Sequence, residues 1–240
     1  MPTKLATVPA NVLVIDIGGT HVKVLATGQK DARKIASGPT LTAARMVRQV
    51  KQLASAWKYD AVSMGYPGPV SHGRILREPF NLGGGWMGFN FAKAFGCPVK
   101  VINDAAMQAL GSYEGGSMLF LGLGTGLGSA MIVNGIVEPA ELAHLPYKKK
   151  TYEDYLGLRG LKRLGRRKWK RHVFKVVESL REALQMDYVV LGGGNAKKLE
   201  ADELPPKTRL GDNRNAFRGG FRLWQKNQPA PLAGRIVAKA

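Results

Sequence analysis

Two short apolar segments, each ending in residues suited to ligand binding, constrain this chain most. Residues 99–102 are apolar and predict a strand, and Asn103 and Asp104 follow it directly. Residues 118–123 form a second apolar run, which leads into the sequence GTGLG at 124–128. A carboxylate at the carboxyl end of a buried strand lies where open α/β sheets bind ligands. Glycines let backbone amides approach an oxyanion closely. Together these features favour transfer of a charged group to a substrate hydroxyl.

The same pattern of strand, glycine loop and strand occurs near the amino terminus. Residues 12–15 are apolar, the sequence DIGGT follows at 16–20, and apolar residues alternate over 22–25. Asp16 could hold a hydrated Mg²⁺, and Lys23 could reach a phosphate oxygen. The donors offered to a phosphate are Gly18, Gly19 and the hydroxyl of Thr20. Because the pattern recurs at Gly124, Thr125 and Gly126, we expect two related halves facing one ligand.

Neither loop matches the common nucleotide-binding signatures. A P-loop requires Gly-Lys-Ser/Thr at the start of a helix, and neither loop contains it. A dinucleotide fingerprint requires glycines that open a helix, whereas residues 129–133 predict a strand. A third glycine turn fits better, because a predicted strand at 188–191 leads into it and a predicted helix at 196–199 follows it. Such a turn suits a nucleotide or phosphate, and its residues include Gly193, Gly194 and Asn195.

Candidate sugar ligands lie in three other places. Glu141 and His144 are three residues apart, so on a helical turn they would share a face. They could bind adjacent hydroxyls or a metal, although two residues alone are poor evidence for zinc. Glu153 is near enough in sequence to join them. The glycine-rich loop 80–86 contains an amide and an aromatic residue and is either a sugar-binding loop or a plain surface loop.

The chain is strongly basic. Its 36 Lys and Arg residues exceed its 17 Asp and Glu residues, which gives a formal net charge of +19. Such a charge attracts nucleic acid, an anionic membrane or an inorganic phosphate polymer, or it serves only solubility. Cationic residues are concentrated over 148–175, where an apolar stripe at helical spacing predicts a packed helix. The cations are therefore either a solvated helix face or a track for a polyanion.

Other features set limits on the class of protein. The single cysteine, Cys97, cannot form an internal disulfide or a multi-cysteine zinc cluster within one chain. No apolar run approaches the roughly 18 residues of a membrane span. The first residues lack the pattern of a secretory signal, so a cytoplasmic protein is expected.

These motifs, in this order, resemble the ROK family of sugar kinases, and most closely its polyphosphate glucokinase branch. The resemblance runs from residue 12 to about residue 224. It is carried by the sequences DIGGT at 16–20, GYPG at 65–68, INDA at 102–105, GLGTGLGSA at 122–130, VVLGGGN at 189–195 and TYEDYLGLRGLKRLG at 151–165.

The resemblance implies an α/β fold made of two actin-like ATPase (ribonuclease H-like) domains with a ligand cleft between them. The expected domains are residues 1–103, which contain the first phosphate loop, and residues 104–224, which contain the second. Residues 225–240, rich in Pro and Ala, are expected to be a disordered tail. A homodimer without membrane attachment is also implied.

The resemblance further implies the chemistry of the site. Asp104 would be the general base for phosphorylation of the 6-hydroxyl of glucose, with polyphosphate, ATP or both as donor and Mg²⁺ as cofactor. The glycine loops described above would bind the donor. The sugar would be bound by Asn103, Glu141, His144, Glu153, Asn81 and Gly68.

The chain departs from the family pattern at two points. Ala143 precedes His144 where the family usually has glycine, which would narrow the pocket or alter sugar preference. The cysteine-rich zinc site of many members is absent, which leaves His144 free for the sugar.

Two alternatives remain open. The first is an ATP-dependent kinase of mannose, fructose or an amino sugar, which the sequence does not separate from a glucokinase. The second is a basic nucleic-acid-binding protein on the same scaffold. That alternative explains the charge but leaves Asp104, Glu141, His144 and Glu153 without a task, so it is disfavoured.

Overall fold

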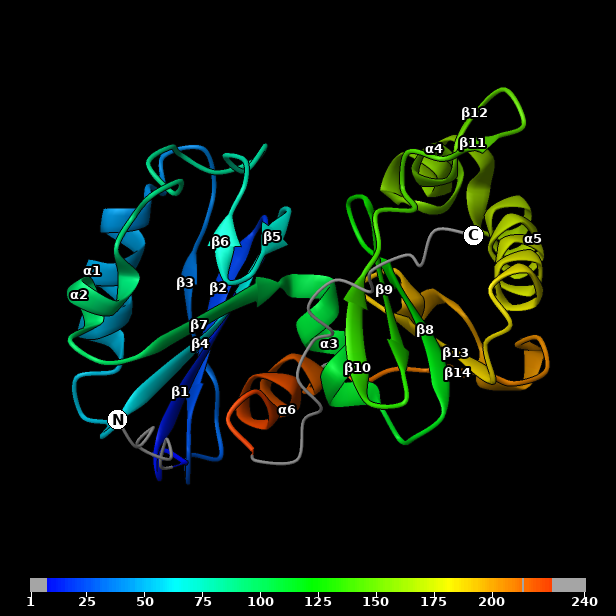
Figure 1. Ribbon diagram of the computed structural model, residues 1–240. Coiled ribbons are helices and arrows are strands. Elements are labelled where there is room, and N and C mark those ends of the chain that lie inside the picture. Colours follow the sequence, from blue (N-terminus) through cyan, green and yellow to red (C-terminus); the bar gives the residue numbers. More distant parts are fainter. Residues whose placement is uncertain (1–7, 213, 226–240) are drawn as a thin grey trace, which may run out of the picture. The chain divides into compact units, whose positions relative to one another are not determined.

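The computed structural model describes residues 8–212 and 214–225 (Figure 1). These residues form two compact units: unit 1 comprises residues 8–111 and 214–225, and unit 2 comprises residues 112–212. The expected boundary was between residues 103 and 104, whereas residues 104–111 cluster with unit 1 and the chain also returns to unit 1 after residue 213. Most of the expected disordered tail, residues 226–240, lies outside the described residues.

Unit 1 is built on a five-stranded mixed sheet with the strand order β3-β2-β1-β4-β7. The first three strands pair antiparallel, and β1, β4 and β7 pair parallel. The strands are β1 (Val12–Ile17), β2 (His21–Ala26), β3 (Arg33–Ala36), β4 (Ala61–Tyr66) and β7 (Val99–Asn103). A separate small hairpin pairs β5 (Val70–Ser71) with β6 (Arg74–Ile75).

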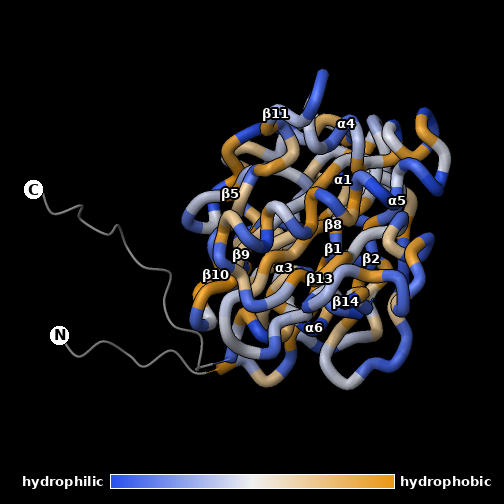
Figure 2. Tube along the Cα trace, turned by 90° about the vertical axis from the view of Figure 1, so that its right-hand side faces the viewer, coloured by the Kyte–Doolittle hydropathy of each residue, from blue (hydrophilic) through white to orange (hydrophobic). Residues whose placement is uncertain are grey.

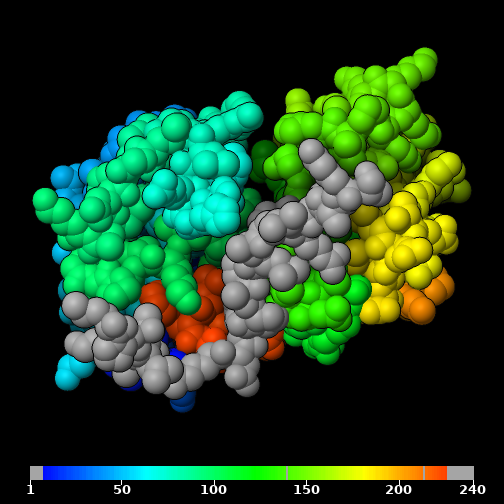
Figure 3. Space-filling view, viewed as in Figure 1, coloured from blue at the N-terminus to red at the C-terminus, as the bar shows by residue number. Residues whose placement is uncertain are grey.

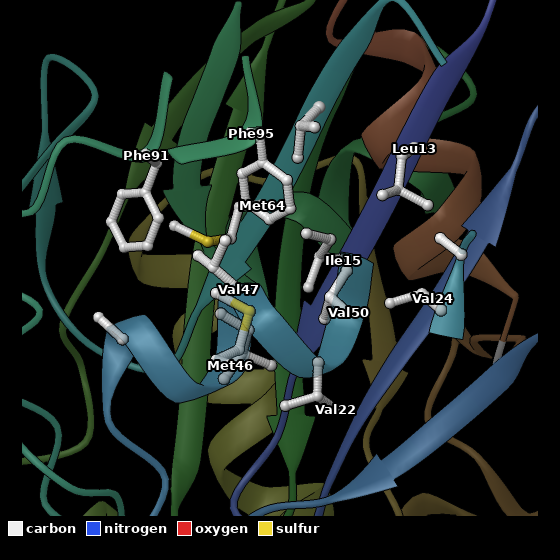
Figure 4. Packing of buried hydrophobic residues seen from close by; sticks show 14 of the residues in the cluster. Leu13, Ile15, Val22, Val24, Met46, Val47, Val50, Met64, Phe91 and Phe95 are labelled. Atoms are coloured by element: carbon white, nitrogen blue, oxygen red, sulfur yellow. The ribbon is translucent and has the colours of Figure 1, made fainter. Parts of the chain in front are cut away.

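One face of this sheet is covered by α1 (Ala43–Leu53) and α2 (Phe91–Phe95). Thr42 caps α1, because its hydroxyl oxygen accepts the Arg45 amide. Alternate residues of β1 and β2 point into the resulting core, as the period of a strand requires. The core residues drawn in Figure 4 include Leu13, Ile15, Val22, Val24, Met46, Val47, Val50, Met64, Phe91 and Phe95.

The other face of the same sheet carries α3 (Asp104–Ser112) and α6 (Asn215–Arg222). Val12 and Val14 of β1 pack there with Met107 of α3 and with Phe217 of α6. The two helices approach at backbone distance, since a methyl group on Gly219 would overlap the Met107 carbonyl. This packing explains why α3 and α6 belong to unit 1 rather than to the carboxyl-terminal domain.

Unit 2 repeats the topology of unit 1. Its sheet has the order β10-β9-β8-β13-β14, again with three antiparallel strands followed by parallel pairing. The strands are β8 (Ser117–Leu123), β9 (Leu127–Val133), β10 (Ile136–Pro139), β13 (Tyr188–Gly192) and β14 (Thr208–Leu210). The prediction of two related halves is therefore confirmed at the level of topology.

The helices of unit 2 pack on this sheet. They are α4 (Tyr152–Leu156) and α5 (Leu158–Ala183), and α5 is kinked at Gly165, whose φ of 73° and ψ of 159° suit glycine alone. The buried stripe of α5 includes Trp169, which donates from Nε1 to the Leu156 carbonyl at 2.8 Å. The remaining elements are a hairpin of β11 (Pro146–Tyr147) and β12 (Lys150–Thr151), and the 3₁₀ helices η1 (Ala196–Lys198) and η2 (Ala201–Glu203).

The strands carry most of the apolar character of the fold. In Figure 2 the tube is orange along parts of β1, β8 and β13 and blue over many of the outer loops. No helix in the described part of the chain combines the length and the apolar composition needed to cross a membrane.

Candidate active site

The turn between β1 and β2 holds the first predicted phosphate loop. Gly18 is engaged within the loop: its N–H donates to the His21 carbonyl at 3.0 Å, and its carbonyl accepts the Ser37 hydroxyl at 2.6 Å. Gly18 therefore shapes the turn, and its N–H is not free for a phosphate, contrary to expectation. Gly19 and Thr20 are exposed, and their N–H groups have no backbone acceptor among the described residues.

Asp16 and Lys23 lie directly opposite one another in the β1–β2 pair, so their side chains share a face. Burial raises the pKa of the Asp16 carboxyl, and the charge of Lys23 opposes this effect. A divalent cation would favour the ionised carboxylate at this strand end. A single carboxylate is also the usual protein contribution to Mg²⁺ that is otherwise held by water and phosphate oxygens. The residues present therefore fit the predicted Mg²⁺.

Asn103 fixes the beginning of α3. Its Oδ1 accepts the Ala106 N–H at 3.1 Å, and its Nδ2 donates to the Gly68 carbonyl at 3.0 Å. Asn103 thus caps a helix and joins the end of β7 to the turn after β4. Asp104 follows as the first residue of α3, where its half-buried carboxylate accepts the Ala105 N–H at 2.8 Å. The predicted base thus stands at a helix start that Asn103 braces.

The loop that contains Asn81 lies beside the first phosphate loop. A methyl group on Gly19 would lie 4.0 Å from Asn81 Nδ2. The loop is organised by Glu78, which the sequence analysis did not single out. Its carboxylate accepts the Trp86 N–H at 3.1 Å and the Met87 N–H at 3.0 Å. Because these donors are backbone amides, no side-chain pattern in the sequence pointed to Glu78.

An aromatic residue in GYPG supports the same loop. Tyr66 is fully buried, donates its hydroxyl to the Arg77 carbonyl at 2.8 Å, and lies 5.6 Å from the Trp86 ring. Burial raises the pKa of Tyr66, and the nearby Glu78 charge raises it further, so the hydroxyl stays protonated and donating. A methyl group on Gly68 would come within 2.8 Å of the Tyr66 ring, which favours glycine there.

In unit 2, the structure brings two predicted glycine loops together. Gly124, in the turn between β8 and β9, accepts the Asn195 Nδ2 through its carbonyl at 2.8 Å. The Asn195 N–H donates to the Leu123 carbonyl, also at 2.8 Å. Gly193 has a φ of +82°, and a methyl group there would lie 2.6 Å from the Leu123 carbonyl oxygen. Asn195 and Gly193 therefore brace the second phosphate loop, while Gly194 stays exposed.

The helix expected at residues 196–199 is shorter than predicted. Only Ala196–Lys198 are helical, in a single 3₁₀ turn. One such turn carries little of the aligned peptide dipole that makes a helix N-terminus an anion site. The glycine turn that contains Gly193, Gly194 and Asn195 is therefore not followed by the helix that was expected to favour a nucleotide or phosphate there.

Glu153 lies against the second phosphate loop. Its Oε2 accepts the Leu127 N–H at 3.3 Å, and a methyl group on Gly126 would overlap this oxygen. Its Oε1 accepts from Arg159 at 2.9 Å. The same loop receives the first turn of α5, where the Leu158 N–H donates to the Gly124 and Thr125 carbonyls at 3.1 and 3.2 Å. The sequence analysis missed Arg159 as the partner of Glu153.

Glu141 and His144 share a turn rather than a helix. The turn closes through the Leu145 N–H, which donates to the Leu142 carbonyl at 3.2 Å. The nearest oxygen of Glu141 is 4.0 Å from His144 Nε2, and the two side chains are 68% and 72% exposed. Both can therefore meet a ligand from solvent.

The segment is anchored from two sides. Ser129, buried in β9, donates to the Ala140 carbonyl at 2.6 Å and accepts the Leu142 N–H at 3.0 Å. The Ala143 carbonyl accepts the Glu153 N–H at 3.0 Å, which ties the Glu141–His144 turn to the start of α4. Among the residues that the structure describes, no group of three or more His, Cys, Asp or Glu side chains is placed to hold a metal.

The site residues thus form two sets, one in each unit. Unit 1 presents Asp104, Asn103 and Asn81 together with the loop that follows Asp16. Unit 2 presents a loop of half-buried glycines and an exposed threonine, with the Glu153 carboxylate against it and the exposed Glu141 and His144 on a turn tied to Glu153. A carboxylate suited to accept a proton and loops suited to phosphate oxygens are the groups that phosphoryl transfer requires.

Comparison with known proteins gives consistent results. The model of the ROK family matches residues 12–139. The polyphosphate glucokinase of Mycobacterium tuberculosis is 27% identical over 208 residues, which cover 78% of each chain.

Solved structures show the fold. The polyphosphate/ATP-glucomannokinase of Arthrobacter sp. strain KM gives a TM-score of 0.74 at 22% identity and covers 91% of this chain and 98% of its own. The ROK family glucokinase of Streptomyces griseus, solved with glucose and AMPPNP, gives 0.68 at 19% identity and covers 89% and 99%. The predicted actin-like ATPase fold is therefore confirmed.

Proposed function

Because this chain belongs to the ROK family, we propose that it is a glucokinase that transfers a phosphoryl group to the 6-hydroxyl of glucose. The donor is polyphosphate, ATP or both. The mycobacterial relative that covers most of the chain is a polyphosphate glucokinase, which supports both substrates. The observation that carries the proposal is Asp104 at the start of α3, behind a helix cap made by Asn103.

The reaction assigns a simple role to Asp104. The 6-hydroxyl oxygen forms a bond to the terminal phosphorus of the donor while the bond from that phosphorus to the rest of the donor breaks. The hydroxyl proton passes to the Asp104 carboxylate. The products are glucose 6-phosphate and ADP, or a polyphosphate shortened by one unit. This role depends on hydrogen-bond reach more than on a shifted pKa.

The glycine loops hold the donor in this proposal. The amides of exposed Gly19 and Thr20 in unit 1, and of exposed Thr125 and half-buried Gly126 in unit 2, donate to phosphate oxygens. Lys23 adds a positive charge. Asp16 would hold Mg²⁺, which would supply further positive charge to the phosphoryl oxygens. Gly193 and Asn195 act by bracing the second loop, as their contacts support.

Each set offers side chains suited to sugar hydroxyls. Asn81 and Asn103 contribute amides, Glu141 and Glu153 contribute carboxylates, and His144 contributes an imidazole. Glu153 also pairs with Arg159, so we expect it to use its remaining lone pairs for a hydroxyl. Ala143 is buried in the core of unit 2 and its carbonyl accepts the Glu153 N–H, so its methyl group packs in the core beside the turn that carries His144.

A matrix of substrates tests the proposal. Glucose, mannose, fructose and glucosamine are each incubated with ATP and with polyphosphate in the presence of Mg²⁺, and the phosphorylated sugar is measured. We expect the highest kcat/KM with glucose. Higher turnover of mannose, fructose or glucosamine than of glucose would favour a kinase of that other sugar, which the departure from the family pattern at Ala143 allows. Absence of turnover for every pair would refute a kinase activity. Light scattering of the same sample tests the homodimer implied by the resemblance.

A further inference from the structure

The cations of α5 differ in whether an acidic residue of unit 2 neutralises them. On one flank, Arg166 donates from Nε to the Lys198 carbonyl at 2.8 Å and pairs with Glu200. On the same flank, Lys170 pairs with Glu203. These two cations are therefore neutralised within unit 2 and hold α5 to the segment that contains η1 and η2. They do not belong to a free basic track, contrary to the expectation for residues 148–175.

The other flank keeps its charge. Lys148, Arg171 and Lys175, which we call the hairpin-side surface, are exposed and make no ion pair with any described residue. Arg171 and Lys175 are four residues apart and share a helix face. Lys148 stands at the turn of the β11–β12 hairpin beside α4 and α5 (Figure 1). Atoms of α5, yellow in Figure 3, form part of the exposed surface.

Aromatic packing fixes the hairpin against α5. The Tyr147 hydroxyl lies 3.0 Å from Nδ1 of His172, and the Tyr147 ring meets the Tyr155 ring edge-on at 5.0 Å. Tyr155 in turn lies 4.9 Å from the His172 ring. On its other side, the Arg163 guanidinium lies 4.9 Å from the Tyr155 ring centre. Lys148, the next residue after Tyr147, is thus held near the helix rather than on a free loop.

The electrostatic effect of this arrangement is visible at His172. Burial lowers the pKa of His172, and the charges of Lys148, Arg171, Arg163 and Lys175 lower it further. Cations from the hairpin and from three turns of α5 therefore act on one point. Glu178 and Glu182 line the same hollow as Arg171 and Lys175 but form no ion pair with either. The like charges around His172 repel one another, and a bound polyanion lowers this repulsion.

We infer that the hairpin-side surface binds the phosphate chain of polyphosphate beyond the group that is transferred. The inference rests on the proposed function. Helix α5 begins at the second phosphate loop, through the Leu158 N–H, and leads toward Arg171. Thirteen residues of helix would span roughly 20 Å if straight, and the kink at Gly165 makes the separation shorter, so a long phosphate polymer can reach from the loop to the surface.

Polyphosphate fits the surface better than a nucleic acid does. Single-stranded nucleic acids bind through cations combined with aromatic rings on which bases stack. Here the rings of Tyr147, Tyr155 and His172 pack against one another. They are therefore poor platforms for bases, while the cations remain available for phosphate.

The test compares two triple variants of the same composition. The first is Lys148→Gln, Arg171→Gln and Lys175→Gln. The matched control is Lys34→Gln, Arg48→Gln and Lys58→Gln, three exposed cations of unit 1. Binding of labelled long-chain polyphosphate is measured at several salt concentrations, and glucose phosphorylation is measured with ATP. Lys175→Gln alone serves if the triple variant has an altered melting temperature.

We expect the first variant to bind polyphosphate at least ~10-fold more weakly than the wild type. Its slope of log Kd against log salt should fall by about 2, since each lost contact accounts for ~0.7. Lys175→Gln alone should lower the slope by ~0.7. The control should change little, and both triple variants should keep wild-type kcat/KM with ATP.

Three outcomes overturn the inference: equal losses in both triple variants, no polyphosphate binding by the wild type, or tighter binding of single-stranded RNA than of polyphosphate at equal salt. These are distinct from failure of the proposed function. If glucose is not phosphorylated by any donor while the binding difference persists, the kinase activity is refuted and the surface stands.

Discussion

Asp104 and its neighbour Asn103 perform different tasks at the same helix start. The Asn103 amide is already occupied by the Ala106 N–H and the Gly68 carbonyl, whereas the Asp104 carboxylate accepts the Ala105 N–H, a contact that an amide oxygen can also make. Asp104→Asn keeps the shape and the acceptor oxygen but removes the base. We expect kcat with glucose and ATP to fall by ~10²–10⁴, with little change in glucose KM or melting temperature.

The control for that experiment is Asp31→Asn, a change at an exposed carboxylate in the turn before β3. It should leave kcat unchanged in the same coupled assay. Wild-type kcat in Asp104→Asn would exclude Asp104 as the base.

His172 predicts how stability depends on pH. Burial and four cations lower its pKa in the folded state, so the unfolded chain binds more protons as pH falls below about 6.5. Above that pH, His172 is neutral in both states and does not disfavour folding. As pH falls toward the folded pKa, the unfolded chain takes up a proton that the folded chain does not, so the free energy of unfolding decreases. Melting temperatures at pH 7.5 and 5.5 measure the effect.

The matched variant is His172→Gln, which does not titrate and still offers an acceptor to the Tyr147 hydroxyl. Its melting temperature should drop less between the two pH values than that of the wild type. An identical drop in both proteins would mean that His172 does not contribute to the pH dependence.

At the scale of elements, one glycine joins two segments of unit 2. Gly193 has a positive φ, and its Cα hydrogen faces the Leu123 backbone, with no room for a methyl group. Gly193→Ala should therefore lower the free energy of unfolding by about 2–4 kcal/mol, from backbone strain and overpacking together. Gly194→Ala is the control, because its methyl group would meet nothing within 4 Å. Urea unfolding of both variants measures the difference, and equal effects would contradict the packing argument.

The elements themselves were largely predictable. Apolar runs gave the positions of β1, β7, β8 and β13, because a buried strand must be apolar on its core side. The repeated strand–glycine–strand pattern predicted the related topology of the two halves. The return of α6 to unit 1 was not predictable, since it depends on the close approach of Gly219 to α3, more than a hundred residues earlier.

The missed site contacts share a physical cause. Glu78 binds backbone amides, and Arg166 and Lys170 pair with acids more than 30 residues away. Neither kind of contact leaves a local pattern in sequence, so a run of cations looked like one continuous face. Only the folded helix separates the neutralised flank from the free flank.

At the scale of the whole molecule, the formal net charge of +19 is carried by a chain whose proposed site residues include several carboxylates. Some of the cations are neutralised locally, as at Arg159, Arg166 and Lys170. The unneutralised cations include those of the hairpin-side surface. A net charge of this size weakens the compact state through self-repulsion unless an anion is present.

The last prediction follows from that excess. A long polyphosphate that contacts about three to six cations releases counterions, so its KM should rise about 15- to 250-fold between 50 and 200 mM salt. ATP reaches few of these cations, and its KM should change by no more than about 3-fold. Glucose phosphorylation with each donor across the salt series measures both effects. If the KM values of polyphosphate and ATP rise in parallel with salt, the net charge of the molecule does not favour polyphosphate over ATP.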